Sequence, residues 1–184
     1  MQSASPAELA QAVIHFWCDE LQPEQHWKKD PELDRHISEQ FGKLREEVLR
    51  TNAAGWRDTP ETLAAAIILL DQFSRNMFRG QAKAFEADPL ALELSKEALA
   101  KGWVDKLPKP LPSFMLMPLQ HSENLEDQER SVAEFRDRDP ENYRYALLHR
   151  DQIKRFGRFP GRNQALGRVS TPEEREVIER GETF

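Results

Sequence analysis

The sequence predicts an all-α protein of about seven or eight helices, packed as stacked antiparallel hairpins without a β-sheet. Three observations support this fold class: a repeated helix-start signal, apolar residues at helical spacing after each start, and the absence of strand signals. No stretch of the 184 residues alternates apolar and polar side chains as a half-buried strand does, and no Asn-Gly hairpin turn occurs.

The helix-start signal is a small oxygen-bearing residue followed by proline. The side-chain oxygen accepts hydrogen bonds from the first helical turn, and proline lacks the N–H group that would have no partner there. This pair occurs six times, at Ser5-Pro6, Asp30-Pro31, Thr59-Pro60, Asp88-Pro89, Asp139-Pro140 and Thr171-Pro172. Glu8 and Glu174 follow the first and last pairs at the spacing of a capping box, which supports a helix at both places.

Apolar residues recur at helical spacing after these starts. The helix from Pro31 is expected to be half exposed, because its apolar residues recur at intervals of three and four: Leu33, Ile37, Phe41, Leu44 and Val48. Residues 63–70 are apolar on every side, which predicts a helix buried at the centre of the core. The helix from Pro89 is expected to end at Lys101-Gly102, a cation followed by a glycine cap.

The spacing of the helix starts predicts how the helices pair. The first four starts lie 25 to 29 residues apart, which leaves room for one helix and a short connection and so favours antiparallel neighbours. Residues 106–112 contain three prolines and are expected to form a surface linker, and Pro118 makes residues 114–119 a short or kinked helix. We expect a single helical domain over residues 1–184.

The composition limits the classes of function. The net charge of -6 argues against a general binder of nucleic acid or of an anionic membrane. A signal-peptide pattern and a membrane-spanning apolar run are both absent from the sequence, so a cytoplasmic location without a membrane partner is expected. The single cysteine, Cys18, lies between aromatic residues and is expected to be structural. No compact metal-binding motif occurs, and neither a metal nor another cofactor is predicted.

The first of three polar clusters continues the buried helix. Asp71, Arg75 and Arg79 are four residues apart and form one stripe, with Gln72 and Asn76 beside it. A charged stripe at the end of an apolar helix indicates either a buried ion-pair network or the wall of a ligand pocket. The sequence leaves both interpretations open.

The second cluster spans residues 121–129 and includes His121 and Glu123. Ser122 or Asn124 could cap the next helix, and acids in its first turn favour the helix dipole. This structural explanation does not cover His121 and Glu123, which stand where a general acid or base, or a metal ligand, could lie.

The third cluster is an arginine-rich segment that follows the helix of His149. Its polar members are Arg155, Arg158, Arg162 and Asn163. Residues 144–168 hold seven basic residues and one acid. Such a segment either pairs with acids elsewhere in the chain or binds an anion, because guanidinium groups bind carboxylates and phosphates with two hydrogen bonds. The shortness of the segment and the acidic chain argue against nucleic acid.

Together these motifs resemble the bacterial family called domain of unknown function 924. The resemblance rests on residues 70–80, 121–131 and 155–174 and extends over nearly the whole chain from Phe16-Trp17 onward. It implies a tetratricopeptide-like helical fold and no established activity. In the arginine-rich segment, the family usually has histidine where this chain has Gly161. A mechanism that needs this imidazole would lack it here, and His149 is the nearby alternative in the sequence.

Two functions of different classes are consistent with the sequence. In the first, the clusters converge on a pocket for a small anionic ligand. The ligand-binding residues would be Gln72, Arg75, Asn76, Arg79, Arg155, Arg158, Arg162 and Asn163. If the protein is an enzyme, the acid and base groups would be Asp71, His121, Glu123 and His149. In the second, a tetratricopeptide-like module binds a protein or peptide, and the polar clusters are structural ion-pair networks.

Overall fold

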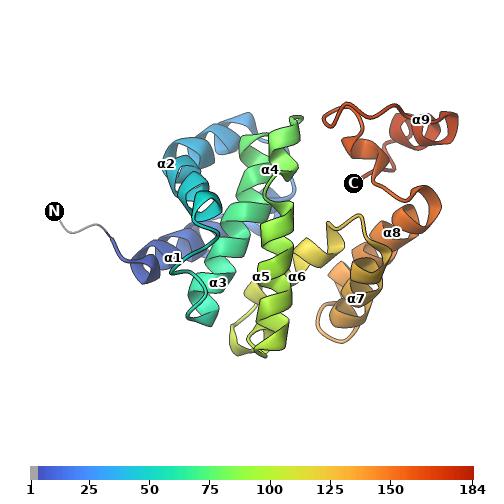
Figure 1. The fold of residues 1–184 in the computed structure, drawn as a ribbon. Helices are drawn as coiled ribbons and strands as arrows, with labels where there is room; N and C mark the ends of the chain where they lie inside the picture. Colours follow the sequence, from blue (N-terminus) through green and yellow to red (C-terminus); the bar gives the residue numbers. More distant parts are fainter. Residues whose placement is uncertain (1–3) are drawn as a thin grey trace. The chain divides into compact units, whose positions relative to one another are not determined.

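The fold of residues 4–184, described by a computed structural model, consists of helices and connecting turns and contains no strand. The α-helices are α1 (Pro6–Ile14), α2 (Pro31–Arg50), α3 (Pro60–Ile67), α4 (Ser74–Met77), α5 (Asp88–Ala100), α6 (Leu111–Gln120), α7 (Leu125–Arg136), α8 (Pro140–Phe156) and α9 (Pro172–Glu179) (Figure 1). The π-helical segment η3 (Ile68–Phe73) joins α3 and α4 into one helix, so these nine segments form eight separate helices in the described range. The predicted all-α class is confirmed.

Shorter helical segments lie next to these helices. The π-helical segment η1 (His15–Glu20) continues α1. The 3-10 segments are η2 (Pro23–His26), η4 (Ala82–Phe85), η5 (Val104–Lys106) and η6 (Pro160–Arg162). Widened π-helical turns are rare and are often found at functional sites, and η3 carries Asp71 and Gln72 of the first polar cluster.

The chain divides into two compact units. The first unit contains the residues up to 79 together with 83–118, and the second contains 80–82 together with 119–184. The single domain and the tetratricopeptide-like arrangement stay predictions.

Five of the six predicted start residues cap a helix with their side chains. They are Ser5, Asp30, Thr59, Asp139 and Thr171. The sixth, Asp88, is the first residue of α5, so it lies one position inside the helix rather than at the cap. Its carboxylate accepts two hydrogen bonds from Arg75. A charged partner from another helix therefore binds this side chain.

The predicted apolar helix is the centre of the core in the first unit. All side chains over residues 63–70 are fully buried. This helix packs against α1, α2 and α5 (Figure 1). Rings of Phe16, Phe41 and Phe73 meet at centroid distances of 5.2, 6.1 and 5.0 Å. Burial of such side chains contributes about 1.5–3 kcal/mol each, which explains why the apolar pattern determines the core.

Cys18 lies half buried in η1, beside this core. Burial, followed by the charge of the neighbouring Asp19, raises the pKa of its thiol to about 11. Because the thiolate is the reactive form, the protonated thiol is a poor nucleophile at neutral pH. The predicted structural role of Cys18 agrees with this environment.

The second unit is built on α7 and α8, which pack against each other after a short connection (Figure 1). Phe135 and Ala146 are buried in this unit. Gly157 ends α8 in the left-handed conformation, with φ 70°. The following residues, 157–171, are called the arginine loop below, and they contain η6, which packs against α9.

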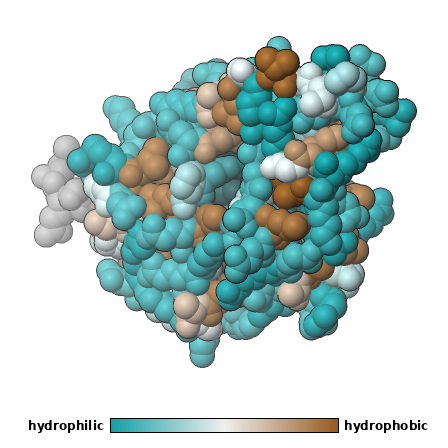
Figure 2. Space-filling model, turned by 45° about the vertical axis from the view of Figure 1, so that its right-hand side comes forward, coloured by the Kyte–Doolittle hydropathy of each residue, from teal (hydrophilic) through white to brown (hydrophobic). Residues whose placement is uncertain are grey.

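The surface of the described chain is mainly polar. The face drawn in Figure 2 is mostly hydrophilic, with hydrophobic residues scattered over it. In residues 4–184, no helix combines the length and the apolar character that crossing a membrane requires.

Candidate functional site

The first polar cluster forms an ion-pair network inside the first unit. Asp71 lies in η3 and is 1% exposed. Arg75 donates to the Oδ1 atom of Asp71 at 3.2 Å and to its backbone carbonyl at 3.0 Å. It also binds both carboxylate oxygens of Asp88, at 2.9 and 3.0 Å. Gln72 donates to the Oδ2 atom of Asp71 at 2.7 Å, so the buried carboxylate has a polar partner on each oxygen.

The other members of this cluster bind a different acid, Asp34 of α2. Arg79 donates from Nε and Nη2 to its two oxygens, each at 2.9 Å. Asn76 donates to Oδ1 of the same carboxylate at 2.8 Å. The hydrogen bonds and charge of Asp34 outweigh partial burial and raise the pKa of Arg79. For this cluster, the geometry favours the ion-pair interpretation over an open anion clamp.

In the second unit, Glu123 connects the second cluster to the third. Arg168 donates from Nη1 and Nη2 to its two carboxylate oxygens, each at 2.9 Å. The backbone N–H of Phe159 donates to Oε1 at 2.9 Å. Burial disfavours the charge of Glu123, but these hydrogen bonds and the positive charges of Arg162 and Arg168 outweigh it and lower its pKa. Glu123 is therefore an ionised anchor for the arginine loop.

A second carboxylate, Glu174 of α9, also binds the arginine loop. Arg158 donates to its two oxygens at 2.7 and 2.8 Å. Asn163 Nδ2 and the backbone N–H of Thr171 also donate to it, at 3.2 and 2.8 Å. The hydrogen bond from Arg158 is the largest of the effects that lower the pKa of Glu174 to about 2, although burial opposes them. The guanidinium of Arg158 is thus neutralised within the unit.

The two predicted histidines also lie together in the second unit. The ring centroids of His121 and His149 are 6.2 Å apart. The Nδ1 atom of His149 contacts the carbonyl of Tyr145 at 2.8 Å, and because a carbonyl only accepts, Nδ1 carries the proton. Phe184 stacks on the His149 ring at 3.8 Å, and Phe159 meets the same ring edge-on at 5.6 Å. His149 is consequently a buried imidazole beneath an aromatic cover.

Arg162, the remaining arginine of the loop, is buried and donates to the backbone carbonyl of His121 at 2.8 Å. Its guanidinium also lies over the ring of Phe159, 4.6 Å from the centroid. These contacts tie the second and third clusters together a second time. No group of three or more His, Cys, Asp or Glu side chains within residues 4–184 is arranged to hold a metal ion.

A groove of about 400 Å³ lies along α8 and α9 in the second unit, and is called the α8–α9 groove below. Its lining residues are Leu148, Asp151, Gln152, Arg155, Phe156, Val177, Gly181, Glu182, Thr183 and Phe184. Arg155 is exposed and lies over the ring of Phe156, 4.7 Å from the centroid. Within the described residues its guanidinium binds no carboxylate, unlike those of Arg75, Arg79 and Arg158.

Gln152 lines the same groove and is only 8% exposed. Its Nε2 atom donates to the carbonyl of Glu182 at 2.9 Å, which determines the orientation of the amide. Its Oε1 atom is buried and accepts no hydrogen bond within residues 4–184. A buried acceptor without a donor costs about 1–3 kcal/mol. The wall of the groove therefore contains one acceptor atom, Gln152 Oε1, that lacks a hydrogen bond within residues 4–184.

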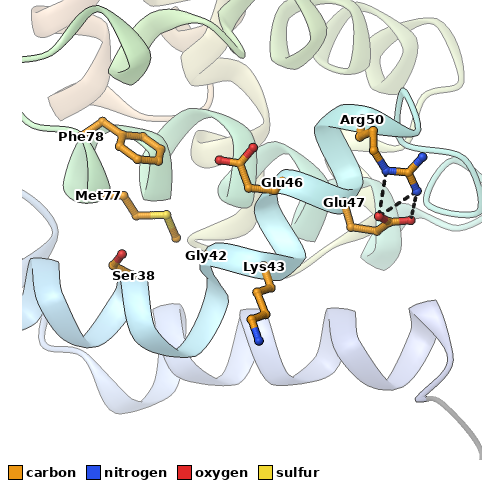
Figure 3. Close-up of a pocket in the computed structure, with 8 residues that line it drawn as sticks. All are labelled: Ser38, Gly42, Lys43, Glu46, Glu47, Arg50, Met77 and Phe78. Carbon is orange, nitrogen blue, oxygen red and sulfur yellow. Dashed lines mark hydrogen bonds and ion pairs between the residues drawn. The ribbon is translucent and has the colours of Figure 1, made fainter.

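A second hollow, of about 590 Å³, lies along α2 in the first unit and is called the α2 hollow below (Figure 3). Met77 and Phe78 supply its apolar side (Figure 3). The α2 residues that line it are Ser38, Gly42, Lys43, Glu46, Glu47 and Arg50. Glu47 binds Arg50 at 2.7 Å, and Glu46 binds Lys83 at 2.8 Å. Both acids of this hollow are therefore neutralised by the chain itself.

Replacing Gly42 of the α2 hollow by alanine is expected to stabilise the protein. A Cβ atom at this position would meet only Ser38 Oγ, at 3.9 Å. Glycine inside a helix costs about 0.5–1 kcal/mol relative to alanine, so Gly42→Ala is expected to raise the free energy of unfolding by about this amount. Urea denaturation measures the change. A loss of stability would contradict the open surroundings of this residue.

The comparisons with known proteins agree with the sequence and the fold. A family profile described as a bacterial protein of unknown function (DUF924) matches residues 13–182. The chain belongs to the DUF924 family. The chain is also similar to a solved structure of a protein of unknown function from Agrobacterium tumefaciens, with 35% identity and a TM-score of 0.91 over 96% of this chain and 100% of that chain. No curated protein matches it.

The DUF924 match includes every predicted site residue, from Asp71 to Asn163, and it extends over both units. The suspected family is thereby confirmed. Its description and that of the solved relative leave the function open. In this DUF924 protein, the second and third clusters lie together in one unit. The convergence of the first cluster with the other two stays a prediction. The ligand-binding and acid-base roles of the predicted residues also stay predictions.

Several residues that organise the site lie outside the predicted set. They are Asp34, Asp88, Gln152, Arg168, Glu174 and Phe184. Asp88 and Glu174 carry a sequence signal, but that signal indicates helix starts. Arg168 belongs to the basic stretch of residues 144–168. The sequence has no signal for Asp34, because its partners follow it by more than 40 residues.

Proposed function

We propose that this DUF924 protein binds a small carboxylate ligand in the α8–α9 groove, with Arg155 as the anion-binding residue. The observation that carries the proposal is the exposed guanidinium of Arg155, which lines the groove and binds no carboxylate of the described chain. A planar guanidinium binds a carboxylate through two hydrogen bonds. The ligand would therefore place its carboxylate at Arg155.

The rest of the groove suits the apolar part of such a ligand. Leu148, Phe156 and Val177 are among its lining residues, and its volume of about 400 Å³ is typical of a small-molecule site. Two acids also line it. Asp151 is bound by Arg150 at 2.8 Å, and Glu182 is exposed, so that solvent screens its charge. These acids leave Arg155 available to an anion.

The proposal assigns anion binding to one arginine, whereas the residues predicted from the sequence include five arginines. Arg75, Arg79 and Arg158 each bind a carboxylate of the chain, and an anion would have to displace it. Displacing a buried ion-pair partner is costly, because the partner charge would be left without compensation. His149 is the acid-base residue adjacent to the groove, since Phe184, which lines the groove, stacks on its ring.

The proposal predicts that Arg155→Gln binds 4-methylpentanoate about tenfold more weakly than the unchanged protein, because a hydrogen-bonded charge pair is lost. Isothermal titration calorimetry measures the two dissociation constants. Arg144→Gln is the matched control, because Arg144 is also exposed on α8 but does not line the groove. If both variants bind 4-methylpentanoate equally, Arg155 is excluded as the anion-binding residue. The same follows if the unchanged protein binds the uncharged 4-methylpentan-1-ol as strongly as it binds the acid.

The alternative function is a tetratricopeptide-like module for a protein or peptide, with the polar clusters as structural ion-pair networks. The contacts of Asp71, Asp34 and Glu174 support the structural part of this alternative. The α2 hollow is the surface that such a partner would use. Since both acids of this hollow are already paired, it indicates no particular partner chemistry, and the carboxylate ligand is the better supported function.

A further inference from the structure

The last described residues, 182–184, lie along a specific track in the second unit. The carbonyl of Glu182 accepts a hydrogen bond from Gln152 of α8 at 2.9 Å. The backbone of Phe184 approaches η6 so closely that a Cβ atom at Gly161 would lie 2.8 Å from the Phe184 carbonyl oxygen. The ring of Phe184 stacks on His149 with an interplanar angle of 24°. The segment is thus held both by its backbone and by its last ring.

The ring of Phe184 lies against one face of the His149 ring, and this stacking position is called the aromatic slot below. His149 forms one wall of this slot through the stacking contact at 3.8 Å, and Phe159 lies edge-on to His149 at 5.6 Å. Aromatic pairs in these geometries are more favourable than their buried area alone would make them. Phe184 itself remains 39% exposed, so it covers the slot without being part of a sealed core. Another aromatic ring could make the same stacking contact with His149.

The slot and the free guanidinium open onto the same groove. Phe184 and Arg155 both line the α8–α9 groove. If Phe184 moves aside, the groove offers a stacking surface for a ring and a guanidinium for a carboxylate. The two features together select for a ligand that carries both groups.

We infer that the ligand of the α8–α9 groove is a small aromatic carboxylate, whose ring replaces that of Phe184 on His149 while its carboxylate binds Arg155. This inference rests on the proposed function and specifies its ligand class. Without ligand, Phe184 is an internal competitor. The observed affinity is then the intrinsic affinity multiplied by the fraction of molecules in which Phe184 leaves the slot open.

Removing the competitor should strengthen the binding of aromatic acids in particular. The probes are benzoate, phenylacetate and 3-phenylpropionate, which vary the distance between ring and carboxylate, and 4-methylpentanoate as the aliphatic control. For the best aromatic probe, Phe184→Ala is expected to lower the dissociation constant about fivefold or more, and to change that of 4-methylpentanoate less than about twofold. Isothermal titration calorimetry gives these values.

A second variant removes the segment from the slot without deleting the ring. In Gly161→Ala, the new Cβ atom would lie 2.8 Å from the Phe184 carbonyl oxygen and 3.1 Å from Thr183 side-chain atoms, so residues 183 and 184 must shift. We expect the same preference for aromatic acids as in Phe184→Ala. In either variant, the imidazole resonances of His149 in NMR spectra should shift with the aromatic probes, because a stacked ring changes the local field.

The outcomes separate the two proposals. Weaker binding of aromatic acids to Phe184→Ala would show that Phe184 is part of the binding wall, and it would overturn the aromatic ligand class. Equal gains for aromatic and aliphatic acids would also overturn it. In both cases, Arg155-dependent binding of 4-methylpentanoate would leave the proposed carboxylate function in place. If no acid binds any of these proteins, the proposed function itself fails.

Discussion

Arg75→Leu is expected to lower the free energy of unfolding by about 3 kcal/mol, the loss typical of breaking a buried ion pair. The substitution removes the guanidinium from Asp71, which is 1% exposed, and from Asp88. Burial alone would lower the pKa of Arg75, but the charges of these two acids outweigh it and raise the pKa, so Arg75 keeps its positive charge in the native state. Urea denaturation at pH 7 measures the loss.

Two controls show whether the loss comes from an uncompensated buried charge. The double variant Asp71→Leu/Arg75→Leu removes both charges and should recover part of the stability. Arg35→Leu breaks an exposed pair with Glu39, whose side chains are 66% and 61% exposed, and should cost less than about 1 kcal/mol. If Arg75→Leu cost no more than Arg35→Leu, the first cluster would not be a structural network, and Arg75 would be available to a ligand.

Glu174→Gln is expected to destabilise the protein by about 2 kcal/mol at pH 7, because glutamine lacks the charge that Arg158 binds. The pKa of Glu174 is about 2, below its ordinary value of 4.5, so ionisation stabilises the folded state. This contribution is complete above about pH 4.5 and is lost as the pH falls towards 2. The stabilities of the two proteins should therefore converge in acid.

Thermal denaturation at pH 7, 5, 3.5 and 2.5 tests this convergence. Glu173→Gln is the matched control, because Glu173 is an exposed acid in the same first turn of α9. Its effect should stay below about 1 kcal/mol at every pH, as expected for an exposed charge at a helix start. A constant difference between Glu174→Gln and the unchanged protein down to pH 2.5 would show that charge is not the stabilising property.

These two predictions bear directly on function. If Arg75 and Arg158 stabilise the fold through their acids, then the arginine-rich motifs are mainly structural, and they position the residues around them. Glu123 and Glu174 both bind the arginine loop, and Gly161 of this loop lies close to residues 183 and 184. The ion pairs thus help to position the residues around His149, whereas Arg155 binds no carboxylate of the described chain.

The positions of most helices could be predicted from the sequence because capping and apolar spacing act within one or two turns. Ser5, Thr171 and the helix over residues 63–70 behave as predicted. Arg45 shows what neighbours along the chain did not predict. It is fully buried in α2, although the predicted apolar positions of this helix do not include it. Two of its hydrogen-bond partners, Ser74 and Glu86, are 29 and 41 residues away, beyond the reach of a local pattern.

The amino-acid order therefore determined the helices, their ends and the segments in which polar residues concentrate, because these depend on neighbours along the chain. Tertiary structure decided which arginines are neutralised. Arg79 meets Asp34 and Arg168 meets Glu123 across 45 residues in each case. A guanidinium binds whichever carboxylate folding brings within about 3 Å, so its availability to a ligand is a property of the folded chain.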